Sequence, residues 1–164
     1  MVLEAELVPP AASDNLQAPT IGAVRFAAMN YLARREHSAF ELKQKLLKRF
    51  SAVDLVDSAI TELSGQHLQS DQRFAEFFVA ARTRRGQGPI RIAAELKQRG
   101  VAADIIDAVV DPSNGEWIDV AKAVVDKKFG KEAPGQVNRA KQSRFLYYRG
   151  FTSDHIRAAI EGMG

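Results

Sequence analysis

An internal repeat of about 50 residues runs through this sequence of 164 residues. When the sequence is shifted by that interval, a leucine, an aspartate and two aliphatic positions fall on residues of the same kind. The matching sets are Leu46, Leu96 and Leu146; Asp54, Asp104 and Asp154; Val56, Ile106 and Ile156; and Ile60, Val110 and Ile160. Units of this size bury little surface alone, so neighbouring units must share their apolar faces. The repeat therefore predicts an elongated array with a long surface, which suits a binding protein better than an enzyme.

The signals between the apolar segments are those of helix ends. Ser38 and Glu41 fit a capping box, and Pro89 suits the first position of a helix. Gly100 and Gly150 suit C-terminal positions with positive φ. No segment shows the strict alternation of a half-buried strand. These signals predict helices over 21–35, 38–49, 53–64, 71–85, 89–99, 102–110, 114–129, 135–149 and 152–162.

The predicted fold is all-α, with three tandem three-helix repeats that resemble helix-turn-helix units and form an elongated, curved molecule. We expect the repeats at 20–66, 67–111 and 112–164. Residues 1–19 contain Pro9, Pro10 and Pro19 and have no apolar periodicity, so we expect a flexible N-terminal tail there.

The sequence offers little chemistry for catalysis. It has no cysteine, which excludes disulfides, thiolate metal sites and cysteine nucleophiles. None of His37, His67 and His155 has another histidine three or four residues away, so we predict exposed or capping histidines and no metal site. We therefore predict no catalytic residue, no cofactor and no small-molecule substrate.

One glycine-rich basic segment, 84–89, runs into a predicted helix start, where backbone amides could hold a phosphate. The segment follows a helix rather than a strand, and it lacks the lysine and hydroxyl of a P-loop. A turn with exposed arginines is therefore the favoured interpretation.

No apolar run reaches the ~18 residues that a membrane helix needs. The first ten residues contain Glu4 and Glu6 and no basic residue, unlike a signal or transit peptide. We expect no membrane partner and a cytoplasmic protein.

The basic residues form three clusters, and each cluster lies mainly on the first two helices of its repeat. They are Arg34, Arg35, Lys43, Lys45, Lys48 and Arg49; Arg82, Arg84, Arg85, Arg91, Lys97 and Arg99; and Lys127, Lys128, Lys131, Arg139, Lys141, Arg144 and Arg149. If the repeats stack regularly, the clusters form a basic stripe that suits an acidic partner. A solvated face is the alternative interpretation.

Aromatic residues near the C-terminus could stack on nucleic-acid bases. Trp117 opens an apolar-periodic helix, so we expect it in the core. Tyr147 and Tyr148 are adjacent and face different directions on a helix, so we expect one of them to be exposed.

Three segments resemble the motifs of one family, the bacterial RecX regulatory proteins. LARREHSAFELKQKL at 32–46 resembles the first-repeat signature, GPIRIAAELKQRG at 88–100 the second, and FLYYRGF at 145–151 the third. The likeness covers residues 21–162 in the right order and spacing. Tyr148 departs from the pattern, since a basic residue is expected there, and residues 1–19 carry no motif.

The resemblance implies a non-enzymatic protein of three three-helix repeats that needs no cofactor of its own. RecX proteins bind the RecA recombinase and its filament on single-stranded DNA. They inhibit its ATPase, strand-exchange and co-protease activities, and so modulate recombinational DNA repair and the SOS response. RecA and the RecA–single-stranded DNA filament are therefore the expected partners, with direct contact to DNA as a possible addition.

The candidate partner-binding or DNA-binding residues are the cations of the three motifs and their flanks. They are Arg34, Arg35, Lys43, Lys45, Arg84, Arg85, Arg91, Lys97, Arg99, Arg144 and Arg149. Two other functions remain open. One is a nucleic-acid-binding helical protein whose basic second helices enter a major groove. The other is a small helical enzyme, which the scattered acid–base groups do not favour.

Overall fold

The computed structural model describes residues 18–130 and 136–162, and these residues contain helices and no strand. The helices are α1 (Ile21–Arg34), α2 (Ala39–Arg49), α3 (Val53–Gly65), α4 (Asp71–Arg84), α5 (Pro89–Gln98), α6 (Ala103–Val109), α7 (Glu116–Phe129), α8 (Gln136–Arg149) and α9 (Ser153–Glu161). The all-α prediction is confirmed, and each predicted helix has its counterpart. Most of the expected tail, residues 1–17, lies outside the described residues.

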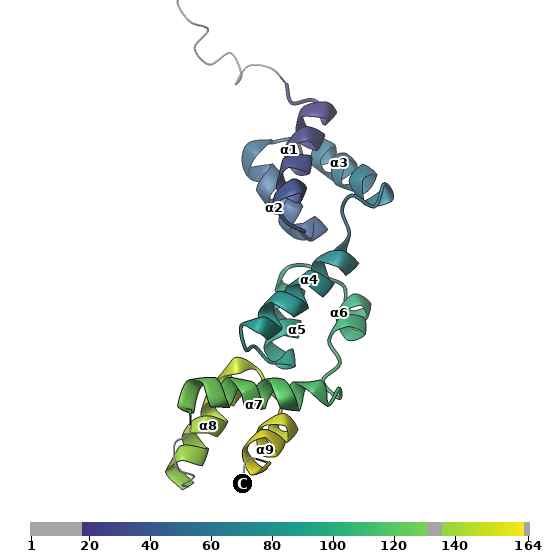
Figure 1. Ribbon diagram of the computed structural model, residues 1–164. Helices are drawn as coiled ribbons and strands as arrows, with labels where there is room; N and C mark the ends of the chain where they lie inside the picture. Colours follow the sequence, from purple (N-terminus) through teal and green to yellow (C-terminus); the bar gives the residue numbers. More distant parts are fainter. Residues whose placement is uncertain (1–17, 131–135, 163–164) are drawn as a thin grey trace, which may run out of the picture.

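The helices are grouped in threes along the molecule. Helices α1–α3, α4–α6 and α7–α9 form three successive bundles, with the first bundle at the opposite end of the molecule from the third (Figure 1). Below, these bundles are called repeats 1, 2 and 3. The tandem arrangement predicted from the sequence is confirmed.

The position of α7 is an exception to the regular interval. Helix α4 begins at Asp71, and the repeat would place the next first helix at position 121, but α7 begins at Glu116. The register is restored by α9, which begins at Ser153 as α6 begins at Ala103.

The bundles are built around two cores rather than three. Repeat 1 has its own core, which includes Val24, Leu42, Leu46, Val56 and Leu63. Repeats 2 and 3 share a second core, which includes Phe74, Ile92, Leu96, Trp117, Val125, Leu146 and Phe151. The repeated leucines Leu46, Leu96 and Leu146 are fully buried, which explains why they recur. The expected core position of Trp117 is also confirmed, and its indole Nε1 donates to the Asp111 carbonyl at 2.9 Å.

The helix caps confirm the sequence signals except in one detail. The hydroxyl of Ser38 accepts from the Glu41 amide at 3.1 Å, but the Glu41 carboxylate does not return to the cap. It binds Arg35 and Arg99 instead, so the predicted capping box is wrong in that half. A reciprocal box forms at α9, where the hydroxyl of Thr152 accepts from the His155 amide and the His155 ring accepts from the Thr152 amide.

Gly100 and Gly150 end their helices as predicted, with φ of 76° and 94°. A side chain is strained at such φ values, which accounts for glycine at both positions.

Two sequence predictions about exposure were wrong. His37 is buried, with 1% of its surface exposed, and its ring contacts the Arg35 carbonyl and the Lys45 Nζ within repeat 1. Tyr147 and Tyr148 are both exposed, at 69% and 70%, where one exposed ring was expected. Their rings meet edge to face with centroids 5.8 Å apart, so each shields part of the other without being buried.

Candidate functional site

Two contacts of the same design join the three repeats. In each contact, the second helices of two neighbouring repeats meet. The C-terminal end of the second helix in the later repeat lies against the N-terminal end of the second helix in the earlier repeat. We call the contact of 38–41 with 99–100 the first joint, and the contact of 88–91 with 149–150 the second joint. Both members of each pair recur at the repeat interval, so the two joints occupy equivalent places in the sequence.

The first joint is held by side chains. The Ser38 hydroxyl donates to the Arg99 carbonyl at 2.7 Å, and the Glu41 carboxylate forms an ion pair with Arg99 across the joint and another with Arg35 at 3.1 Å. The Ala39 amide donates to the Asp71 carboxylate at 2.8 Å. Charge-assisted bonds of this kind are stronger than neutral ones and demand specific geometry.

Glu41 of the first joint and two groups beside the joint, His37 and Lys45, have shifted pKa values. Burial lowers the pKa of His37, whose Nδ1 lies 3.0 Å from the Arg35 carbonyl and whose Nε2 lies 3.0 Å from the Lys45 Nζ. Burial also lowers the pKa of Lys45, with a further contribution from Arg35. For Glu41, burial alone would raise the pKa, but the hydrogen bonds from Arg35 and Arg99 outweigh it and hold the pKa below its ordinary value.

The second joint is held by backbone. The Gly88 amide donates to the Arg149 carbonyl at 2.7 Å, and the Ile90 amide donates to the Gly150 carbonyl at 2.9 Å. A Cβ on Gly88 would lie 2.5 Å from the Gly150 carbonyl carbon, so the two chains approach as closely as glycine permits. The joint also continues into the core that repeats 2 and 3 share.

Each joint leaves a groove lined with arginine. The first groove, of about 680 Å³, lies between repeats 1 and 2. It is lined by the end of α1 with Arg34 and Arg35, by the face of α4 that carries Phe74, Phe77 and Phe78, and by Arg82, Arg84, Arg85 and Arg99.

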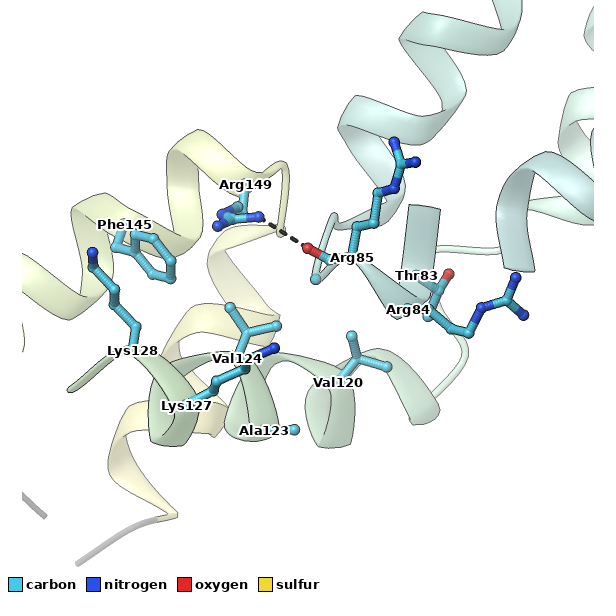
Figure 2. A pocket seen from close by; sticks show the side chains of 11 residues that line it. Thr83, Arg84, Arg85, Val120, Ala123, Val124, Lys127, Lys128, Phe145 and Arg149 are labelled. Atoms are coloured by element: carbon cyan, nitrogen blue, oxygen red, sulfur yellow. Dashed lines mark hydrogen bonds between the residues drawn. The ribbon is translucent and has the colours of Figure 1, made fainter. Parts of the chain in front are cut away.

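The second groove, of about 470 Å³, lies between repeats 2 and 3. Figure 2 shows Val120 and Val124 projecting from α7 toward the segment that carries Arg85. The Arg149 guanidinium closes one side by donating to the Arg85 carbonyl at 3.0 Å. Lys127, Lys128 and Phe145 also line the groove.

The structure gathers six of the eleven candidate residues into the two grooves and separates the others. The groove residues are Arg34, Arg35, Arg84, Arg85, Arg99 and Arg149. Lys45 lies beneath the first joint against His37, and Lys43 forms an ion pair with Asp57 at 2.9 Å. Arg91 pairs with Glu95 on the exposed side of α5, and Lys97 and Arg144 are exposed outside both grooves.

The groove arginines differ in what they already bind. Arg35 and Arg99 share Glu41, so they hold the first joint together. In the part of the chain that the structure describes, Arg34, Arg84 and Arg85 form no ion pair. These three exposed guanidiniums are the ones available to an acidic partner.

The apolar floors of the grooves were not predicted from the sequence. Phe74, Phe77 and Phe78 have the i, i+3, i+4 spacing of one helix face, but the same spacing also describes a core face. Phe77 is 64% exposed, which only the structure reveals. Lys127 and Lys128 were part of the third basic cluster but not among the candidate residues, and they line the second groove.

The described residues contain no group of three or more histidine, aspartate or glutamate side chains that could hold a metal ion. Within the same residues, no helix has the length and apolar character needed to cross a membrane.

Comparison with known proteins identifies the repeats. The models of the first, second and third three-helix domains of RecX match residues 25–63, 70–110 and 115–160. The regulatory protein RecX of Halorhodospira halophila is 46% identical over 138 residues, which cover 84% of this chain and 86% of that protein. That of Ectopseudomonas mendocina is 43% identical over 141 residues, covering 85% and 94%.

The fold also agrees with a solved structure. The crystal structure of RecX from Lactobacillus salivarius aligns with a TM-score of 0.76 at 20% identity, covering 87% of this chain and 96% of that one. With all three domain models matched in order along an array of three-helix bundles, this chain belongs to the RecX family of regulatory proteins.

Proposed function

We propose that this chain is a non-enzymatic cytoplasmic regulator that binds the RecA recombinase and its filament on single-stranded DNA. By binding, it inhibits the ATPase, strand-exchange and co-protease activities of RecA, and so modulates recombinational repair and the SOS response. Membership of the RecX family supports a regulatory role. The observation that carries the proposal is the pair of arginine-lined grooves, placed alike at two joints of the array.

The mechanism follows from the array. A filament presents the same surface at regular intervals, so an array of repeats contacts more than one subunit at once. Several weak contacts then act together through effective concentration. A protein that bridges subunits stabilises the arrangement it fits, and this opposes the rearrangements that hydrolysis and subunit exchange require.

Charge reversal tests this function. Arg34→Glu combined with Arg84→Glu should abolish most of the inhibition of the DNA-dependent ATPase of RecA, because like charges repel where opposite charges paired. Arg35 is left unchanged because it supports the first joint through Glu41. The matched control is Lys48→Glu with Arg157→Glu, which reverses two exposed charges outside both grooves. Circular dichroism must show both variants folded.

Added salt should weaken the inhibition by the wild-type chain, because exposed charges are screened beyond ~10 Å at 0.1 M. Full inhibition by the folded Arg34→Glu, Arg84→Glu variant would contradict the proposal and leave these arginines as a solvated face.

Direct binding to nucleic acid is a second candidate function. The exposed rings of Tyr147 and Tyr148 favour it, since exposed aromatic rings stack on bases. It predicts tight binding to naked DNA with a steep dependence on salt. A filter-binding assay with duplex and single-stranded DNA, without RecA, distinguishes the two functions.

A further inference from the structure

We propose that the two grooves are equivalent sites that receive the same acidic, apolar-tipped protein segment from two subunits of the repeating partner. This inference rests on the proposed function and specifies which chemistry of the filament is recognised. The recognised group is a carboxylate beside an apolar side chain on protein, and not the phosphates of DNA.

The equivalence of the grooves is visible in their linings. Arg34 and Arg35 at the end of α1 correspond to Arg84 and Arg85 at the end of α4, and Arg99 corresponds to Arg149. The residues of the two floors also correspond in pairs. All pairs have the same sequence separation, although it differs from the 50-residue interval of the repeats. The pairs are Phe74 and Val120, Phe77 and Ala123, Phe78 and Val124, Ala81 and Lys127, and Arg82 and Lys128.

The helix faces of repeats 2 and 3 therefore correspond, even though α7 does not keep the 50-residue interval. Helix α7 starts early, and its groove-lining residues are shifted by a similar amount along the sequence. Equivalent positions of α4 and α7 therefore still face the preceding repeat. Arg84 and Arg85 line both grooves, so the C-terminal end of α4 sets the spacing between the two sites. Two sites held at one spacing suit two copies of one element better than two unrelated ligands.

The rims of the grooves select for negative charge. Among the described residues, the lining of the first groove has one carboxylate, Glu36, which is already paired with Arg73 at 2.8 Å, and the lining of the second groove has none. Arg34, Arg84 and Arg85 have no ion pair within the described residues. A carboxylate that enters either groove therefore meets unneutralised guanidinium groups in a partly enclosed setting, where ion pairs are stronger than in open water.

The floors favour protein over nucleic acid. Val120, Ala123 and Val124 have no ring on which a base could stack. The Phe145 ring is already covered by Lys128 and Arg149, whose charged groups lie 5.9 Å and 5.0 Å from its centroid.

In the first groove, Arg82 and Arg99 cover Phe78 in the same way, at 4.7 Å and 5.0 Å, and Phe74 is buried. Phe77 has an open ring, but one ring offers no series of faces for successive bases. Single-stranded nucleic acid binds on open ring faces, whereas an aliphatic or aromatic side chain buries such floors directly.

The test uses variants confined to one groove each. Arg34→Glu alters the first groove, Lys127→Glu alters the second, and a third chain carries both changes. Affinity is measured for RecA filaments formed on oligo(dT) with a slowly hydrolysed ATP analogue, and for the same oligo(dT) without RecA. Each single variant should weaken filament binding by a similar factor of about 10 or more, because two linked sites exceed one by ~10²–10⁴. Binding to naked oligo(dT) should be unchanged.

A second variant removes apolar surface without changing charge. Phe77→Ser should weaken filament binding several-fold while leaving binding to naked oligo(dT) unchanged. Phe26→Ser is its matched control, because Phe26 is 69% exposed on α1 and lies outside both grooves. Both rings are largely exposed, so both variants should fold. At saturation, the filament should hold one chain for every two or more RecA subunits.

The outcomes separate this inference from the function on which it rests. If the wild-type chain does not bind the filament, the proposed function fails. If the wild type binds but only one groove variant weakens binding, or if saturation reaches one chain for each RecA subunit, the two-site inference is overturned and the function stands. If the variants lose naked oligo(dT) binding in parallel with filament binding, the grooves bind phosphate and the protein segment is the wrong ligand.

Discussion

The two joints of this molecule occupy equivalent sequence positions and solve the same packing problem with different chemistry. In the first joint, the Ser38 side chain reaches the Arg99 carbonyl. In the second joint, Gly88 stands at the place of Ser38, and its backbone amide bonds the Arg149 carbonyl directly. Glycine removes the side chain and lets the two backbones meet.

The difference extends to charge and core. The Glu41 carboxylate that binds Arg35 and Arg99 at the first joint is replaced by Arg91 at the second. Repeats 2 and 3 share one apolar core, whereas repeat 1 keeps its own. Both joints are closely packed, since a Cβ on Gly100 would lie 2.5 Å from the Phe40 Cβ and one on Gly150 would lie 2.4 Å from the Arg91 Cβ. The first joint adds ion pairs to this packing, whereas the second adds backbone hydrogen bonds and a shared core. We expect repeat 1 to separate from the array more easily than repeat 3.

The largest expected effect on stability comes from adding a side chain where the second joint has room only for glycine. Gly150→Ala should lower the free energy of unfolding by about 2–4 kcal/mol, because its Cβ would meet the backbone of Arg91 while φ stays positive. Gly130→Ala is the matched control, since Gly130 also has positive φ but no residue in the described part of the chain lies within 4 Å of its Cβ position. The control should cost only about 1 kcal/mol. Chemical denaturation measures both, and equal losses would show that the second joint is not tightly packed.

An intermediate effect should follow when the charge of the first joint is removed. Glu41→Gln should lower the free energy of unfolding by about 2 kcal/mol, because Arg35 and Arg99 lose a carboxylate that is only 10% exposed. Glu62→Gln removes an exposed partner of Arg25 and should cost less than about 0.5 kcal/mol.

Amide hydrogen exchange shows which helices Glu41→Gln destabilises. In Glu41→Gln, amides of α1–α3 should exchange faster, while those of α5 and α8 keep their protection because their core is separate. Faster exchange throughout the molecule would contradict the independence of repeat 1.

The smallest effect is a pH dependence of the first joint. Burial lowers the pKa of His37 from its ordinary value of 6.5, so the unfolded chain takes up the proton first as the pH falls. Stability should be complete above about pH 6.5 and should decrease below it, by less than about 1.4 kcal/mol per pH unit. The lowered pKa of Glu41 acts in the same direction at more acidic pH, below its ordinary 4.5.

His37→Gln should flatten this dependence, since glutamine does not titrate and already occupies the equivalent position 87. Denaturation midpoints at pH 7.5 and 5.5 provide the measurement, and an unaltered slope in His37→Gln would assign the pH dependence to other groups.

Helix positions could be predicted because their signals are local. Caps, helix-end glycines and apolar spacing act within a few residues, and they placed Gly100 and Gly150 at positive φ correctly. The joints could not be predicted, because Ser38 meets Arg99 across 61 residues of sequence. The capping-box pattern was misleading at Glu41 for this reason, since a distant arginine offered its carboxylate a stronger bond than the cap amide.

The candidate site was predictable in part. The arginine pairs 34–35 and 84–85 stand at equivalent helix ends, and a repeated basic pattern suffices to select them. Nothing in that pattern shows that Arg35 pairs with Glu41 while Arg34 has no ion pair with any described residue, or that Arg91 lies outside both grooves. Such differences depend on which face of each helix the neighbouring repeat covers.

The sequence by itself determined that this chain forms an array of three-helix repeats of the RecX type, with leucines at the centre of each unit. It could do so because apolar periodicity and helix caps depend on residues close in sequence, and each repeat contains these signals again. Only the tertiary structure decided that two repeats share a core, that the joints differ, and that the α7 face regains its place beside Arg84 and Arg85 despite its displaced start. Those features arise from contacts between repeats, where burial and charge pairing act between residues far apart in the chain.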